Sequence, residues 1–184
     1  KAAQCGAAIA GSVAIKEDGN FYNRFYFVKP DGDVVSYDKK HLFTYGKEHE
    51  TFTAGDGRVM VEYRGVRILL EICYDLRFPV WSRNHGDYDM IIYVASWPAS
   101  RISAWNSLLV ARAVENQCYV AGVNRVGTDP SDSYSGGSVI VDPYGNVIAR
   151  CQDGIESCSE AEIDMELLEA FRRKFFSDMC EKTM

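Results

Sequence analysis

Cys73 is the residue of this sequence whose type and position most clearly suggest chemistry. It follows an apolar run at 66–72, which is expected to form a strand covered on both faces, and it precedes a short helical stretch. A cysteine between a buried strand and a helix lies in a sharp turn, with backbone N–H groups directed at its sulfur. These groups favour a thiolate over a thiol and can donate to an oxyanion. The position predicts a nucleophile, although most free cysteines are simply small buried hydrophobic residues.

Lys39 is a second candidate for a chemical role. It comes just after an expected strand at 34–37. If Tyr37, Lys39 and His41 share one side of an extended chain, Lys39 points inward and Lys40 points outward. A buried ammonium is costly unless it is paired or faces a developing negative charge. From this segment alone, two solvated surface lysines remain the simpler interpretation.

Aromatic residues and one arginine follow a later strand, which is expected to begin near Met90. Trp97 and Pro98 end that strand, at the same sheet edge as Cys73, and Arg101 and Trp105 follow on the next loop and helix start. An aromatic wall with one arginine suits a small acyl group that carries a carboxylate, which arginine can hold in a bidentate fork. The alternative is that both tryptophans are core residues and Arg101 is solvated.

The rest of the sequence predicts the elements that must position these side chains. Strands are expected at 8–15, 24–28, 34–37, 59–63, 66–72, 90–95, 119–123, 138–141 and 146–149, and helices at about 105–116 and 165–176. The segment 38–57 has no clear period and is expected to be a long, functional loop. Strands that alternate with helices indicate an α/β layered fold, and we expect one domain over 1–184.

Composition excludes several classes of function. Of 184 residues, 47% are hydrophobic and 25% are charged, as in ordinary globular proteins, and no apolar run approaches a membrane span. The net charge of -6 argues against a nucleic acid or an anionic membrane as partner. Six cysteines without a CxxC pair indicate reduced thiols in a cytoplasmic protein, and three histidines without HxxxH or HExxH spacing predict no metal site. No cofactor is expected.

Several motifs together resemble the carbon–nitrogen hydrolase (nitrilase) superfamily. Its lysine motif resembles Tyr37-x-Lys39-x-His41-Leu42-Phe43, and its cysteine motif resembles Ile72-Cys73-Tyr74-Asp75-Leu76-Arg77-Phe78-Pro79. Further stretches resemble the family in the same order: Ser96-Trp97-Pro98, Arg112-Ala113-x-Glu115-Asn116-Gln117, Asn124-Arg125-Val126-Gly127 and Asp142-Pro143-x-Gly145. The resemblance covers nearly the whole chain and, among branches, is greatest to the bacterial omega-amidases.

This resemblance implies a four-layer α-β-β-α sandwich, a homodimer and a Glu–Lys–Cys triad. Cys73 would attack the terminal amide of a small 2-oxo dicarboxylic monoamide and form a thioester with loss of ammonia. Lys39 and the Tyr74 backbone N–H would hold the oxyanion. A second glutamate of the family matches Glu48, with Glu50 as the fallback, and its implied role is to orient Lys39 and the attacking water.

The sequence departs from the family at the general base. In the family this glutamate lies on a Pro-Glu segment well upstream of the lysine motif, and nothing in 1–38 resembles that segment. Glu17 lies in a polar turn and no proline precedes it. We therefore expect that the N-terminal strand, the helix and the general-base glutamate are missing from this sequence. The 184-residue chain alone is expected to be inactive.

Other interpretations stay open at this point. Within the same superfamily, the protein could be an N-carbamoyl amino acid hydrolase or a nitrilase. From another class, it could be a non-catalytic α/β binding protein in which Cys73 is a relic. Asp75 and Arg77 flank the nucleophile and are expected to fix the turn rather than contact substrate. A pair between Arg112 and Glu115 is expected to be structural.

Overall fold

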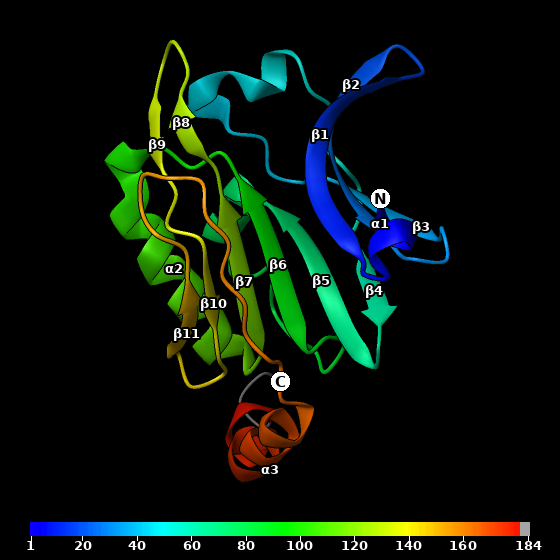
Figure 1. Ribbon diagram of the computed structural model, residues 1–184, viewed down its shortest axis with the longest axis vertical. Helices are drawn as coiled ribbons and strands as arrows, with labels where there is room; N and C mark the ends of the chain where they lie inside the picture. The colour runs from blue at the N-terminus through cyan, green and yellow to red at the C-terminus, as the bar shows by residue number, and fades with distance from the viewer. Residues whose placement is uncertain (181–184) are drawn as a thin grey trace.

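The computed structural model describes residues 1–180 and contains two main sheets (Figure 1). The smaller sheet has the order β1-β2-β3 and is antiparallel throughout. Its strands are β1 (Ile9–Glu17), β2 (Asn20–Val28) and β3 (Val34–Asp38). The strands predicted at 8–15, 24–28 and 34–37 are therefore confirmed, and each is longer than predicted.

The larger sheet has the order β11-β10-β7-β6-β5-β4. Its strands are β4 (Met60–Tyr63), β5 (Val66–Ile72), β6 (Met90–Ala95), β7 (Tyr119–Asn124), β10 (Val139–Val141) and β11 (Val147–Arg150). The central strands β5, β6 and β7 run parallel to one another. Because parallel strands end at the same edge, the segments after Ile72, Ala95 and Asn124 meet there.

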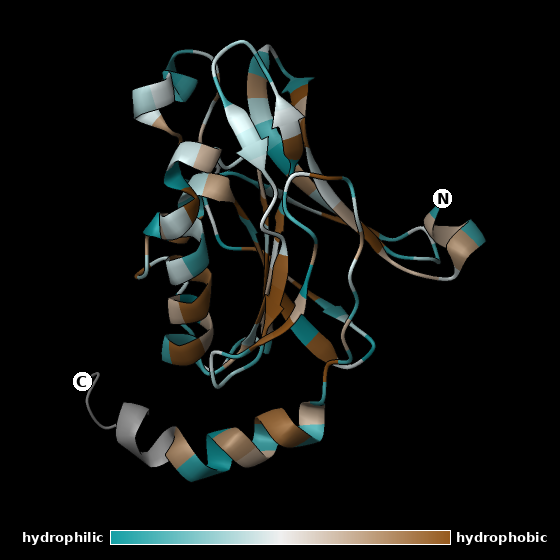
Figure 2. Cartoon of the chain, turned by 60° about the vertical axis from the view of Figure 1, so that its left-hand side comes forward, coloured by the Kyte–Doolittle hydropathy of each residue, from teal (hydrophilic) through white to brown (hydrophobic). Residues whose placement is uncertain are grey.

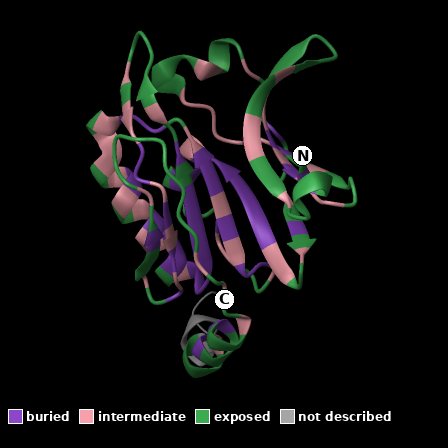
Figure 3. Cartoon of the chain, in the orientation of Figure 1, coloured by how far each residue is buried: buried purple, intermediate pink, exposed green. Residues whose placement is uncertain are grey.

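The larger sheet carries a different layer on each face. On one face, α2 (Ile102–Asn116) packs over the strands and forms a core around Leu69, Trp105 and Leu109. On the other face, the smaller sheet covers β5 and forms a core that joins Phe25 to Leu70. Figure 2 shows α2 beside the strands, and Figure 3 shows the central strands buried and β1 mostly exposed. The layers follow the expected α/β sandwich.

The rest of the chain is made of short elements and one C-terminal helix. The short elements are α1 (Ala2–Cys5), β8 (Val126–Thr128), β9 (Ser133–Ser135) and the 3-10 turns η1 (Thr44–Gly46), η2 (Glu48–Glu50), η3 (Cys73–Arg77) and η4 (Ala99–Arg101). The helix α3 (Met165–Cys180) docks through Arg172, which pairs with Asp89 at 2.7 Å. Among residues 1–180, no helix combines the length and apolar character needed to cross a bilayer.

Gly122 lets α2 lie directly on β7, and this close approach generates a prediction. A Cβ at position 122 would lie 2.9 Å from Trp105 Cζ2 and would also meet the Leu109 side chain. We expect Gly122→Ala to destabilise the fold by about 1–3 kcal/mol, because the packed layer has no room for another methyl group. Thermal unfolding should show a Tm lower by several degrees. Gly57→Ala, where a Cβ meets nothing within 4 Å, is the control. An equal Tm for both variants would contradict this account of the packing.

Candidate active site

Cys73 stands on a strained turn at the end of β5. Its φ is +48°, a left-handed conformation that residues other than glycine seldom adopt. The following turn, η3, is a 3-10 helix of five residues, so its first N–H groups have no acceptor inside the turn. The Tyr74 N–H is the first of these after the nucleophile. The side chain of Cys73 is partly buried and lines the main cavity of the molecule.

Lys39 is buried beside Cys73 and is held by Glu48. Its side chain is only 3% exposed, and its Nζ lies 2.6 Å from Glu48 Oε2. The same oxygen accepts the Phe43 N–H at 2.7 Å, and Asn23 Nδ2 donates to Glu48 Oε1 at 3.3 Å. The long loop therefore delivers the ion pair that a buried ammonium requires. Lys39 points inward rather than into solvent.

Glu50, the alternative to Glu48, lies elsewhere. Its side chain is 58% exposed and pairs with Lys47 at 3.9 Å. Of the two glutamates, Glu48 is the one that lines the cavity and contacts Lys39.

The Asp75 carboxylate is fully buried and joins the cysteine turn to the lysine segment. Oδ2 accepts the Ile72 N–H at 3.0 Å and the Tyr37 hydroxyl at 2.8 Å. Oδ1 accepts the His41 N–H at 2.9 Å and lies 2.8 Å from His41 Nδ1. Asp75 fixes the turn, as expected, and it also reaches residues on both sides of Lys39.

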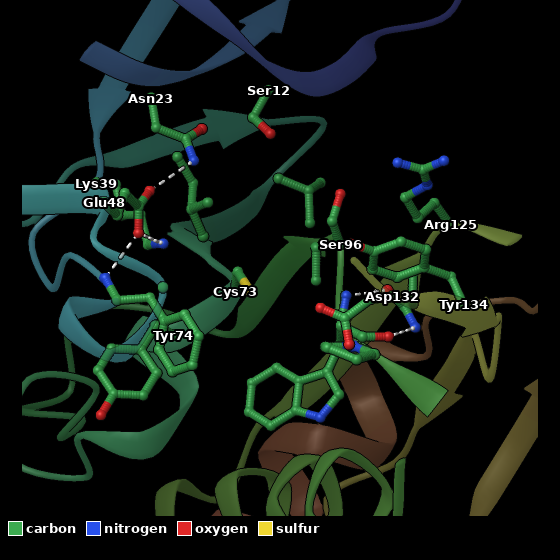
Figure 4. A pocket seen from close by; sticks show the side chains of 18 of the residues that line it. Ser12, Asn23, Lys39, Glu48, Cys73, Tyr74, Ser96, Arg125, Asp132 and Tyr134 are labelled. Carbon is green, nitrogen blue, oxygen red and sulfur yellow. Dashed lines mark hydrogen bonds and ion pairs between the residues drawn. The ribbon is translucent and has the colours of Figure 1, made fainter. Parts of the chain in front are cut away.

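A cavity of about 680 Å³ brings these residues together with the substrate-side candidates. Its walls include Lys39, Glu48 and Cys73, which come from the long loop and from the end of β5 (Figure 4). Trp97 and Arg101, which follow β6 in the sequence, line the same cavity. The volume suits a small organic molecule. The nucleophile and the ammonium thus share one cavity.

The acidity of Cys73 differs from the expectation that its turn favours a thiolate. Burial raises the pKa of Cys73 above its usual value, and the carboxylates of Glu48 and Asp75 raise the pKa further. Lys39 and the Ser96 backbone N–H lower the pKa without reversing the direction. The expectation was wrong because desolvation outweighs the few donors of a five-residue turn. At neutral pH the Cys73 side chain is therefore a thiol, and it can act as a nucleophile only with a proton acceptor.

The three substrate-side candidates have different surroundings. Trp97 lines the cavity, and its indole N–H donates to the Arg101 carbonyl at 2.9 Å. Arg101 lines the cavity too, with its guanidinium 5.3 Å from the Phe43 ring centre. Trp105 does not reach the cavity: it is fully buried, packs on Trp97 at 5.5 Å and donates to the Gly137 carbonyl. Its assignment as a substrate contact is corrected to a core residue behind Trp97.

Other residues of the cavity had no role in the sequence analysis. Asn124 ends β7 and holds Trp97 by two hydrogen bonds, from the Trp97 N–H at 2.7 Å and to the Trp97 carbonyl at 3.0 Å. Asn23 reaches Glu48 from β2. The hairpin β8–β9 forms a further wall, where the Arg125 guanidinium stacks on the Tyr134 ring at 4.4 Å. Of these residues, only Asn124 and Arg125 could have been found from the sequence, because they belong to the motif Asn124-Arg125-Val126-Gly127.

Metal ligands do not cluster in the described part of the chain. No three of its histidine, cysteine, aspartate and glutamate residues are grouped so that they could hold a metal ion.

The site has the features of a hydrolase that uses a thiol nucleophile. A cysteine on a strained turn faces a buried ammonium and backbone donors inside a cavity of an α/β sandwich, and these parts suit attack on a carbonyl carbon. The comparisons with known proteins agree with this class. Residues 1–173 match the family of the carbon-nitrogen hydrolases, and the chain belongs to that family.

Individual relatives are more specific. The chain is 51% identical to omega-amidase YafV of Yersinia enterocolitica over 92% of its own length and 66% of that protein. It is 40% identical to 2-oxoglutaramate amidase of Bacillus subtilis, over 86% of the chain and 62% of that protein. The crystal structure of XC1258 from Xanthomonas campestris superposes with a TM-score of 0.94 at 40% identity, covering all of this chain and 72% of that one. The chain thus spans about two thirds of these relatives.

Glu71 lies on β5, two residues before Cys73, and is fully buried, and no ion pair of the described residues involves its carboxyl group. Its Oε2 accepts the Ser82 hydroxyl at 2.9 Å, and its Oε1 has no partner among the described residues. Burial, followed by the neighbouring Asp75 carboxylate, raises the pKa of Glu71 to about 8. At neutral pH this side chain is largely protonated in the fold.

We expect Glu71 to make stability depend on pH. Because its pKa is higher in the folded than in the unfolded chain, its favourable contribution is complete below about pH 4.5 and is lost as the pH rises through about 8. Glu71→Gln keeps the shape of the protonated side chain and cannot ionise. Thermal unfolding from about pH 5 to about pH 9 should show that the parent loses Tm relative to this variant. A constant difference in Tm across that range would show that Glu71 does not titrate in the fold.

Proposed function

We propose that the protein is a thiol amidohydrolase that cleaves the terminal amide of a small 2-oxo dicarboxylic monoamide and releases ammonia. The observation that carries the proposal is the shared cavity, which is lined by Cys73, by the Lys39–Glu48 ion pair and by Arg101. The names of two relatives, an omega-amidase and a 2-oxoglutaramate amidase, support the same substrate class.

The reaction divides into two displacements. In the first, the Cys73 sulfur adds to the amide carbon as its proton leaves, and the carbonyl oxygen takes a negative charge. Lys39 and the Tyr74 N–H stabilise this oxyanion, a contact worth about 3 kcal/mol of barrier in comparable sites. The intermediate collapses, the C–N bond breaks and ammonia leaves with an added proton, so a thioester remains. In the second, water adds to the thioester, the carboxylic acid forms and Cys73 regains its proton.

The proton acceptor for Cys73 is the part of this scheme that residues 1–180 supply least well. Glu48 already accepts from Lys39, Phe43 and Asn23, and Asp75 accepts four hydrogen bonds. The oxygens of both carboxylates are thus already engaged by donors within the fold. We therefore propose that a further glutamate, outside the 184 residues, accepts this proton and that Glu48 orients Lys39 and the water. Turnover by residues 1–184 alone, equal to that of the complete encoded protein, would contradict this assignment.

The cellular setting is also a proposal. We propose that the protein works in the cytoplasm as a homodimer, on a small molecule rather than a nucleic acid or a membrane. The free cysteines of the described chain, with none paired in a disulfide, and the net charge of -6 support this setting. The dimer rests on the family resemblance.

A substrate panel tests the reaction class. Release of ammonia is measured from 2-oxoglutaramate, from an uncharged short amide, from a nitrile and from an N-carbamoyl amino acid. We expect the 2-oxo acid amide to have the highest kcat/KM. A preference for the nitrile or the carbamoyl compound would move the protein to another branch of the family.

Arg101 is expected to bind the carboxylate of the substrate. Arg101→Ala should raise KM about 10- to 100-fold for 2-oxoglutaramate, because a charge-assisted pair contributes about 1.5–3 kcal/mol. The uncharged amide should change less than about threefold. Arg77→Ala is the matched control, since its guanidinium also lines the cavity but stacks on Trp97 at 5.1 Å. Equal effects of Arg101→Ala on both amides would remove Arg101 from the carboxylate role.

A further inference from the structure

Asp75 lies outside the cavity and makes more hydrogen bonds than are needed to fix the turn at Cys73. One bond, to the Ile72 N–H, is enough to close the turn at Cys73. The other three reach Tyr37 and His41, which lie 38 and 34 residues away in the sequence. The contacts are spread over both carboxylate oxygens: Oδ2 accepts from Ile72 and Tyr37, and Oδ1 lies against the backbone N–H and the ring of His41.

The residues that Asp75 holds stand on either side of Lys39. Tyr37 precedes Lys39 by two residues and His41 follows it by two. Tyr37 is 1% exposed, and its hydroxyl also accepts the Lys40 N–H at 3.0 Å. The His41 ring stacks on Phe78, beyond the cysteine turn, with ring centres 3.7 Å apart. The backbone that carries Lys39 is thus fixed at three points to the turn that carries Cys73.

We propose that Asp75 is a positioning residue that sets where the Lys39 ammonium stands relative to the Cys73 sulfur. The proposal rests on the proposed function for its kinetic readout, but the alkylation rate described below needs no substrate. Asp75 touches neither of these reacting groups. It acts through Tyr37, His41 and Ile72, and a displacement of about 1 Å between reacting groups can reduce a rate about 100-fold.

Asp75→Asn tests the proposal because its amide offers one acceptor oxygen and places an NH2 group against donors. In the complete encoded protein, we expect kcat for 2-oxoglutaramate to fall at least about 100-fold while KM changes less than about threefold. A partly unfolded enzyme also loses kcat at an unchanged KM, so the loss is judged against a control variant that is destabilised elsewhere in the fold.

Asp89→Asn is the matched control. Asp89 is also buried, at 4% exposed, and accepts hydrogen bonds from Arg67 and Arg172. It precedes β6 and so lies at the opposite edge of the larger sheet from Cys73. We expect this variant to lower Tm and to keep kcat within about threefold of the parent.

The rate at which iodoacetamide alkylates Cys73 is measured by mass spectrometry of the peptides. It distinguishes a displacement of Lys39 from the mere loss of the Asp75 charge. Three charged groups act on the sulfur, Lys39 more strongly than Glu48 or Asp75. Loss of the Asp75 charge alone would speed alkylation, whereas displacement of Lys39 slows it. We expect alkylation about tenfold slower at fixed pH in Asp75→Asn, with exposed Cys5 unchanged as an internal control.

Each outcome decides for or against the proposal. Faster alkylation of Cys73 in Asp75→Asn, or a kcat within about threefold of Asp89→Asn, overturns it. If Asp75→Asn does not fold, Tyr37→Phe decides: it removes one donor to Asp75 and the acceptor of the Lys40 N–H, and we expect kcat about 3- to 10-fold lower. An unchanged kcat there also overturns it. If the parent hydrolyses no amide, the proposed function fails, and the alkylation rates still test the placement of Lys39.

Discussion

The structure depends on the burial of one ammonium group beside one thiol. Lys39 is 3% exposed, and a buried charge of this kind is tolerated only when it is paired and hydrogen-bonded. Glu48 supplies the pair, and Asn23 and the Phe43 N–H supply the remaining bonds to that carboxylate. The long loop from β3 to β4 can be understood from this requirement, since its path brings Glu48 back to Lys39.

Burial strengthens the interaction of the Lys39 ammonium with a nearby negative charge, and it also makes the Cys73 thiol less acidic. A dry cavity strengthens the attraction between an ammonium and a developing oxyanion, but it also raises the pKa of a thiol. In the mechanism we propose, two tasks are therefore separate: Lys39 and the turn N–H groups stabilise the transition state, and another group deprotonates Cys73. Strain at the φ of +48° is the conformational cost of placing the sulfur at the sheet edge.

Much of the fold and of the site could be predicted from the sequence. The apolar run 66–72 and the runs 138–141 and 146–149, on either side of Asp142-Pro143-Tyr144-Gly145, predicted strands that the structure confirms, because both predictions depend on local pattern. Lys39 and Cys73 were found through motifs. The pKa of Cys73, the burial of Trp105 and the bond from Asn23 to Glu48 could not be predicted, because each depends on packing between segments distant in the sequence. The short hairpin β8–β9 has a polar sequence without alternation and left no strand signal.

The central claim is that the Cys73 sulfur forms a covalent bond with the acyl group of the substrate. Turnover of 2-oxoglutaramate by the complete protein can be stopped with acid and the peptides examined by mass spectrometry. The account predicts an acyl adduct on the peptide that contains Cys73, and neither adduct nor ammonia release with Cys73→Ala. Steady ammonia release by Cys73→Ala, or an adduct on another residue, would contradict it.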